Sequence, residues 1–92
     1  MSVMPISNQE KRKLKAAAQR LEPVLKVGKN GLSAEFLQSV NAALNDHGLI
    51  KIKFADFKEQ KKELAPRIAE ETGSELMMRV GNVAVFYRAR QD

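Results

Sequence analysis

The chain has 92 residues, 43% of them hydrophobic and 29% charged, so it is long enough for one compact domain and too apolar for a disordered segment. The lack of cysteine and the single histidine, His47, exclude a disulfide framework, a thiolate nucleophile and a Cys/His zinc site. Sixteen basic against eleven acidic residues give a net charge of +5, and no run approaches the roughly 20 apolar residues of a membrane span.

The amino-terminal segment predicts a short lead followed by a helix. Residues 1–6 are expected to be flexible. Ser7 and Glu10 have the spacing of a capping box, in which each side chain accepts a hydrogen bond from a free amide of the first helical turn. Pro23 then ends the helical segment. Four apolar residues at helical spacing form one stripe, namely Leu14, Ala17, Ala18 and Leu21.

Residues 24–27 form a short apolar run that is typical of a buried strand. The next four residues, 28–31, read GKNG and have the composition of a tight turn. A helix is predicted to follow, with Ser33 as its cap and Gly48, directly after His47, at its end. Its buried side consists of Phe36, Leu37, Val40, Ala43 and Leu44.

Residues 49–54 alternate between apolar and basic side chains, which predicts a half-buried strand. Two lysines, Lys51 and Lys53, share the face opposite the apolar residues. The buried face of this strand is therefore expected to carry Ile50, Ile52 and Phe54.

A third helix is predicted to begin at a second capping box, formed by Asp56 and Glu59, and to end at Gly73. Pro66 lies in its interior and lacks an amide proton, so we expect a kink or a split near Ala65. Acidic and basic residues are interleaved along this helix, which is typical of a solvated, ion-paired surface rather than of a catalytic carboxylate pair.

The last two strands, residues 75–80 and 83–88, flank Gly81-Asn82, which suits a two-residue type II′ hairpin turn. That turn predicts a register in which three pairs share one side: Val80 with Val83, Met78 with Val85, and Leu76 with Tyr87. On the other side it pairs Arg79 with Ala84, Met77 with Phe86, and Glu75 with Arg88. The opposite charges of the last pair favour this register.

The predicted order of elements is α-β-α-β-α-β-β. Alternating strands and helices imply a parallel crossover connection, to which the hairpin adds an antiparallel edge. The expected fold is therefore α+β (mixed α/β), with two layers and a four-stranded mixed sheet that ends in a carboxy-terminal hairpin.

Basic residues concentrate at the amino-terminal end, where residues 1–30 contain seven basic and two acidic residues, while the remainder is balanced at nine of each. A neutral body with a basic end indicates a negatively charged partner, either nucleic acid or an anionic membrane surface. The candidate contacts are Lys11, Arg12 and Lys15 in the first helix, Lys26 in the first strand, and Lys51 and Lys53 in the second.

The GKNG turn is the candidate binding loop. A turn between a strand and a helix amino terminus lets backbone amides approach an anion, with the positive end of the helix dipole behind them. Gly28 and Gly31 leave room for phosphates, Lys29 adds a mobile charge and Asn30 a hydrogen-bonding side chain, as in the GXXG loop of KH domains. We expect the basic first helix to lie beside this turn, so that both contact one polyanion. A connecting turn with incidental glycines is the alternative interpretation.

Phe86 is the one candidate for base stacking. If Phe86 shared a sheet face with Arg79 and Arg88, it would form an aromatic centre in a basic patch. The alternative, which the composition favours, is that Phe86 and Met77 are covered by the alanine-rich stripe of the first helix. Binding is then expected mainly to phosphates and RNA shape.

Four ordered segments resemble the YhbY-like bacterial, stand-alone form of the CRM domain (chloroplast RNA splicing and ribosome maturation). They are residues 27–33 (VGKNGLS), 47–53 (HGLIKIK), 68–74 (IAEETGS) and the hairpin motifs VGN at 80–82 and FYR at 86–88. The resemblance spans nearly the whole chain. It implies a fold related to the carboxy-terminal domain of translation initiation factor three, RNA contact through residues 28–31, and a role with precursors of the large ribosomal subunit.

The expected protein is thus a cytoplasmic, monomeric RNA-binding domain covering residues 1–92, and not an enzyme. Its partner is expected to be ribosomal RNA or the pre-ribosomal large subunit, without cofactor, metal, membrane or small-molecule substrate. The alternative is a basic protein-interaction adaptor associated with ribosomes or translation factors. Membrane association through the first helix is disfavoured because its apolar stripe is small.

Overall fold

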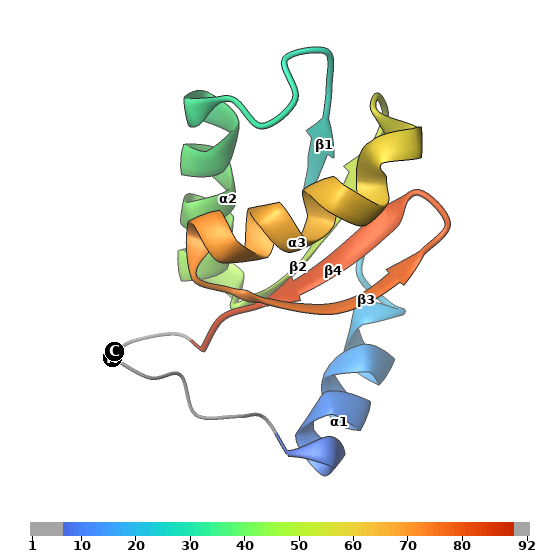
Figure 1. The fold of residues 1–92 in the computed structure, drawn as a ribbon. Helices are drawn as coiled ribbons and strands as arrows, with labels where there is room; N and C mark the ends of the chain where they lie inside the picture. The colour runs from blue at the N-terminus through green and yellow to red at the C-terminus, as the bar shows by residue number, and fades with distance from the viewer. Residues whose placement is uncertain (1–6, 90–92) are drawn as a thin grey trace.

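The computed structural model describes residues 7–89 and shows the predicted order of helices and strands (Figure 1). The expected flexibility of residues 1–6 lies outside the described residues. The elements are α1 (Asn8–Ala18), β1 (Leu25–Val27), α2 (Ala34–His47), β2 (Leu49–Phe54), the 3-10 turn η1 (Lys58–Gln60), α3 (Lys61–Thr72), β3 (Glu75–Val80) and β4 (Val83–Tyr87).

The four strands form one mixed sheet in the order β1-β2-β4-β3, which confirms the predicted α+β fold. β1 runs parallel to β2, and the other neighbouring pairs are antiparallel. Two helices, α2 and α3, cover one face of the sheet, and α1 contacts the opposite face near β3 and β4 (Figure 1). We call the face that carries α1 the open face.

The main core lies between the sheet and the helices α2 and α3. The alternation of β2 is confirmed, because Ile50, Ile52 and Phe54 are at most 1% exposed while Lys53 on the opposite face is exposed. Burial of these apolar side chains is the main stabilising term of the fold. The buried members of this cluster are Val27, Val40, Leu44, Ile50, Ile52, Phe54, Ala65, Ile68, Ala69, Ala84 and Phe86.

Local capping signals start the first two helices at the predicted residues, although α1 ends at Ala18, well before Pro23. The Ser7 hydroxyl accepts a hydrogen bond from the amide of Glu10 at 3.1 Å, and the Ser33 hydroxyl accepts one from the amide of Phe36 at 3.1 Å. Each bond satisfies one amide that the first helical turn leaves free. α2 ends at Gly48, whose φ of +76° disfavours a residue with a β-carbon.

The start of α3 differs from the prediction. Neither Asp56 nor Glu59 caps a helix, because Phe57 adopts a left-handed conformation and directs the chain into the 3-10 turn η1 before α3 begins. α3 is not split near Ala65 and continues through Pro66. The missing amide of Pro66 removes a single hydrogen bond near the first turns of the helix, and the irregularity lies earlier, where η1 meets α3.

The hairpin register is correct next to the turn and wrong beyond a β-bulge. Val80 pairs with Val83 and Met78 with Val85, but Leu76 then pairs with Phe86 and Glu75 with Tyr87. The extra residue at the bulge, Met77, shifts the predicted pairs of Leu76, Met77 and Glu75 by one position.

The bulge also decides which side chains α1 covers. Met77, Met78 and Val85 pack with Ala18 and Leu14 of α1 in a second cluster. The expected cover of Met77 by the first helix is therefore confirmed.

Phe86, in contrast, is fully buried in the main core on the α2 and α3 side, and α1 does not cover it. Its position rules out stacking on an RNA base. The two alternatives for Phe86 both assumed the unbulged register, in which Phe86 would share a side with Met77.

Arg88, which was predicted to pair with Glu75, instead joins β4 to both helices of the main core. Its guanidinium donates to the Asn41 side-chain oxygen at 2.7 Å, the Asn45 side-chain oxygen at 2.8 Å, and the backbone oxygens of Thr72 and Asn41 at 2.6 and 3.1 Å. A single planar side chain thus satisfies acceptors on α2 and at the end of α3.

Replacing Arg88 by alanine is expected to lower the free energy of unfolding by about 2–3 kcal/mol, because partly buried carbonyl acceptors lose a charged donor. Arg79, an exposed residue of the same hairpin, provides the control, and Arg79→Ala should change stability by less than about 0.5 kcal/mol. Urea denaturation of the two variants measures the difference. Equal effects would show that the Arg88 contacts do not contribute to stability.

Candidate nucleic-acid interface

The candidate loop, residues 28–31, is positioned by the parallel pairing of β1 with β2. Val27 at the end of β1 lies opposite Phe54 at the end of β2, so the chain leaves both strands at the same edge of the sheet. The carbonyl of Val27 accepts hydrogen bonds from the amides of Ala55 and Asp56 at 3.1 and 3.0 Å. The loop after β1 and the turn after β2 are therefore held next to each other.

The loop itself is a hydrogen-bonded reverse turn. The amide of Gly31 donates to the carbonyl of Gly28 at 3.0 Å, which leaves Lys29 and Asn30 exposed at the tip. Within residues 7–89, the amides of Lys29 and Asn30 donate to no backbone carbonyl. The tip thus presents free donors and one ammonium group to solvent.

The two glycines of the loop differ in whether the fold requires glycine at their position. Gly31 has a φ of +60°, and a β-carbon on it would lie 3.4 Å from the ring of Phe57. Gly28 has no positive φ, and a β-carbon on it would have no heavy atom within 4 Å. The fold therefore requires glycine at position 31 and not at position 28.

A hollow of about 240 Å³ lies on the α2 side of the loop. Lys26, Lys29 and Asn30 contribute to its lining, but so does Glu35, in the first turn of α2. Ser33 already occupies one amide of that turn, and the carboxylate of Glu35 opposes the positive end of the helix dipole. The positive potential that the dipole of α2 was expected to add at the loop is therefore partly cancelled.

Three of the predicted lysines share the open face of the sheet. Lys26 and Lys53 lie opposite each other in the β1–β2 pairing and are exposed. Lys51 is half-buried, and its ammonium donates to the carbonyl of Leu21 at 3.0 Å. Lys51 thus fixes the segment that follows α1, while Lys26 and Lys53 are available to a ligand. We call these two residues, together with Lys29, the lysine row.

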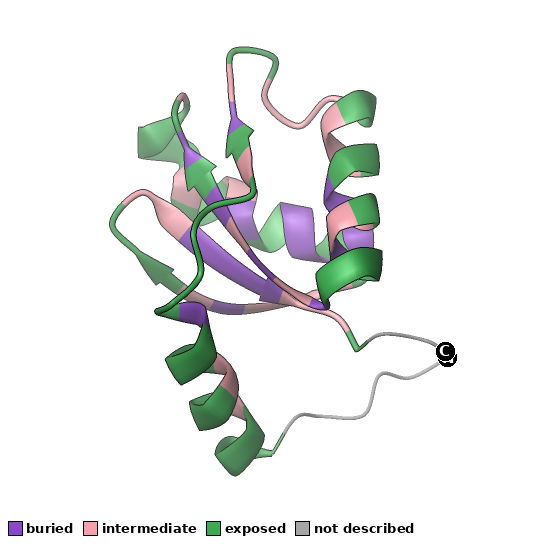
Figure 2. Ribbon diagram, turned by 180° about the vertical axis from the view of Figure 1, so that it is seen from behind, coloured by how far each residue is buried: buried purple, intermediate pink, exposed green. Residues whose placement is uncertain are grey.

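The basic residues of α1 do not lie beside the loop, which corrects the expected arrangement. Figures 1 and 2 place α1 and residues 28–31 at opposite ends of the molecule, whose longest dimension is 35 Å. Arg12 and Lys15 are exposed, and Lys11 is 3.8 Å from the carboxylate of Glu75. The physical reason is the apolar contact of α1 with the bulged hairpin, which holds the helix away from the edge where β1 ends.

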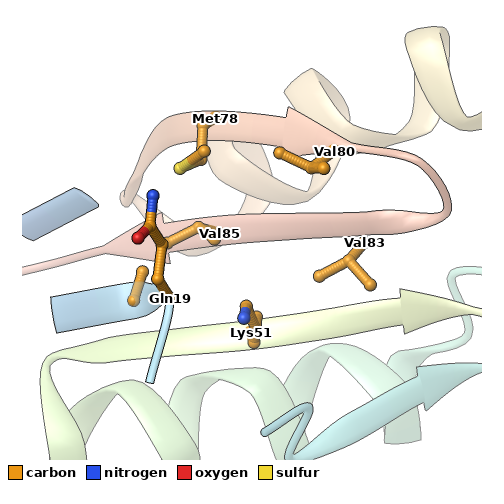
Figure 3. A pocket seen from close by; sticks show the side chains of 7 residues that line it. Gln19, Lys51, Met78, Val80, Val83 and Val85 are labelled. Atoms are coloured by element: carbon orange, nitrogen blue, oxygen red, sulfur yellow. The ribbon is translucent and has the colours of Figure 1, made fainter. Parts of the chain in front are cut away.

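A shallow apolar groove of about 270 Å³ lies between the end of α1 and the hairpin (Figure 3). Met78, Val83 and Val85 form its apolar lining, and Lys51 contributes to one side. Val80 at its end is 62% exposed. This groove depends on the bulge in β3 and on the position of α1, so the sequence alone does not predict it.

Phe57 is a further residue beside the candidate loop, and no local pattern in the sequence predicts its place there. The residue is 41% exposed, and its ring lies against Gly31 of the loop. With a φ of +56°, it is also the one non-glycine residue in the described chain that has a positive φ, a conformation that costs about 1–2 kcal/mol. The available signal was a phenylalanine placed outside the alternation of β2 and followed by a lysine.

The described residues contain neither a metal site nor a membrane span. No three His, Cys, Asp or Glu side chains between residues 7 and 89 are grouped so that they could bind a metal ion. None of the helices in this range has the length and apolar character that a membrane crossing requires.

Comparison with known proteins gives consistent matches. Residues 6–88 match the family model of the CRS1/YhbY (CRM) domain. The Haemophilus influenzae protein named "RNA-binding protein" is 35% identical over 88 residues, which cover 95% of this chain and 89% of the relative. The Pseudomonas aeruginosa protein named "Probable RNA-binding protein PA4753" is 34% identical over 86 residues, which cover 92% of this chain and 83% of the relative.

A solved structure is also similar. The solution structure of the hypothetical protein SAV1595 from Staphylococcus aureus matches with a TM-score of 0.78 and 30% sequence identity. The match covers 96% of this chain and 93% of that chain. The similarity of fold therefore extends over nearly the whole chain.

Replacing Gly31 by alanine is expected to lower the free energy of unfolding by about 1–2 kcal/mol, since the side chain forces a left-handed conformation. Gly28→Ala is the matched control, because position 28 has no positive φ and a β-carbon there meets open space. We expect its stability to equal or slightly exceed that of the parent chain. Thermal unfolding distinguishes the two, and equal destabilisation would contradict the described geometry of the loop.

Proposed function

Because the chain belongs to the CRS1/YhbY (CRM) domain family, we propose that it binds structured RNA through residues 28–31 and the lysine row. Two relatives of similar length are named as RNA-binding proteins, which supports RNA as the partner. The exposed lysines Lys26, Lys29 and Lys53 supply the positive charge, and phosphates are the ligands that such charges contact in nucleic acids.

The proposal depends on the structural surroundings of Gly28. Nothing in the described chain occupies the space that a β-carbon on Gly28 would fill, and its backbone conformation does not require glycine. Beside it, the amides of Lys29 and Asn30 donate to no backbone carbonyl. Neither packing within the protein nor a positive φ therefore requires glycine at this position. A glycine of this kind, next to free amide donors and a lysine, allows a phosphate to approach the backbone closely.

The open face can contact RNA at two separated positions. The loop and the exposed lysines of β1 and β2 form one position, and Arg12 and Lys15 of α1 form the other. An RNA helix or stem-loop that follows this face can contact both, which a single short strand bound at the loop cannot. The proposed activity is binding alone, mainly to phosphates and to the shape of the RNA.

The RNA that we propose is ribosomal RNA in precursors of the large subunit. The resemblance of four ordered segments, including residues 27–33 and 47–53, to YhbY-like CRM proteins supports this choice. The protein is proposed to assist subunit assembly as a bound partner of the RNA.

Replacing Lys29 by glutamine is expected to weaken RNA binding several-fold and to reduce the slope of log affinity against log salt by about 0.7–0.9, the amount for one lost phosphate contact. For the parent chain, about five phosphate contacts correspond to a slope near −4. Fluorescence anisotropy with a labelled RNA stem-loop, measured over a series of salt concentrations, gives both quantities.

Arg67→Gln is the matched control, because Arg67 is exposed on α3, on the other side of the sheet. It removes the same charge and should leave the slope unchanged. Gly28→Ala should weaken binding without loss of stability, since its new methyl group meets the phosphate rather than the protein. An unchanged affinity in both Lys29→Gln and Gly28→Ala would reject the role of the loop.

The ribosomal partner is tested by crosslinking the protein to RNA in cells and sequencing the recovered RNA. Precursor RNA of the large subunit should be enriched over messenger and transfer RNA, and less of it should be recovered with Lys29→Gln. An even distribution over all RNA classes would contradict the ribosomal assignment. Protein partners that persist after nuclease treatment, without enriched RNA, would favour the adaptor function instead.

A further inference from the structure

Phe57 lies directly against the proposed RNA-binding loop. Its Cε2 and Cζ atoms are 3.4 and 3.7 Å from the position that a β-carbon on Gly31 would occupy. The turn that carries Phe57 is held to the end of β1 by the hydrogen bonds from Ala55 and Asp56 to the carbonyl of Val27. The ring therefore has a fixed position relative to the loop backbone.

Phe57 differs from the other phenylalanines of the chain. Phe54 and Phe86 are buried in the main core, and Phe36 is half-buried at the start of α2. Phe57 is 41% exposed, so part of its ring is available to a ligand. Among the Phe and Tyr residues of the described chain it is the one that is exposed, since Tyr87 is half-buried.

The backbone conformation at Phe57 is unfavourable for phenylalanine, so the packing of its ring is not a sufficient reason for this residue type. Its φ of +56° and ψ of +35° place it in the left-handed region, where glycine or asparagine is less strained than phenylalanine. The contact with Gly31 buries only part of the ring. A strained backbone that presents an aromatic side chain beside a ligand loop is an arrangement found at functional sites.

The charged residues next to Phe57 are of both signs, with Asp56 and Glu59 acidic and Lys58 basic. Lys58 follows Phe57 in the chain and is exposed, and Lys29 is exposed in the adjoining loop. A nucleotide can place its phosphate on the loop backbone while its base reaches the neighbouring ring. Stacking of this kind accepts any base, because every base has a π face.

We propose that Phe57 is a stacking platform for an unpaired RNA base next to the phosphate-binding loop. This inference rests on the proposed RNA binding and adds a preference to it: the bound RNA has an unpaired nucleotide at the loop. A fully paired helix does not offer such a base, because its bases are stacked on one another. The protein should therefore prefer a stem-loop or a bulged helix to a continuous duplex.

The test compares Phe57→Leu with the parent chain on two labelled RNAs: a stem-loop with unpaired adenosines and a continuous duplex of the same length. Leucine is strained in the left-handed conformation as phenylalanine is, and it retains an apolar contact with Gly31, but it has no π face. We expect about tenfold weaker binding to the stem-loop, the equivalent of about 1.4 kcal/mol, and little change for the duplex. Thermal unfolding checks that the variant is folded.

Phe57→Trp provides an independent readout because the chain contains no other tryptophan. Its fluorescence should be quenched when the stem-loop binds and remain unchanged with the duplex, and affinity for the stem-loop should be retained. If Phe57→Leu binds the stem-loop as tightly as the parent chain while Lys29→Gln still binds more weakly, the stacking proposal fails and the proposed function stands. Equal losses on both RNAs would also overturn stacking, since they indicate a structural role. A parent chain that binds neither RNA would reject both proposals.

Discussion

The parallel pairing of β1 with β2 is the constraint on which the proposed site depends. It brings the ends of two strands to one edge of the sheet and places Val27 opposite Phe54. The carbonyl of Val27 then accepts two amides of the turn after β2. Without this pairing the GKNG loop would still be a tight turn, but it would have no defined position relative to Phe57 or to the lysines of the open face.

The two faces of the sheet carry different side chains: apolar residues face the core, and lysines lie on the open face. Ile50 and Ile52 of β2 pack under α2 and α3, whereas Lys51 and Lys53 alternate with them on the open face. Since β1 pairs in register, Lys26 joins the same face opposite Lys53. Positive charge can therefore accumulate on one side of a small domain without entering its core, where an unpaired ammonium would be costly. This arrangement is suited to a polyanion.

Lys51 and Arg88 serve the fold although their charge suggested binding, and the charge of Lys11 has an acidic neighbour. Lys51 donates to the carbonyl of Leu21, Lys11 lies near Glu75, and Arg88 connects β4 with α2 and α3. The formal charge of the chain thus overstates the charge available to a ligand. Lys29, at the tip of the loop, makes no such contact among the described side chains.

The sequence by itself determined the order of the elements, the caps at Ser7 and Ser33, the alternation of β2 and the place of the GKNG turn between a strand and a helix. These features depend on residues within a few positions of one another, so local spacing predicts them. Only the tertiary structure decided the bulge at Met77, the distance between α1 and the loop, and the contact of Phe57 with Gly31. Each of these results from packing between segments that are distant in sequence, and a register shift of one residue moves a side chain to the other face of the sheet.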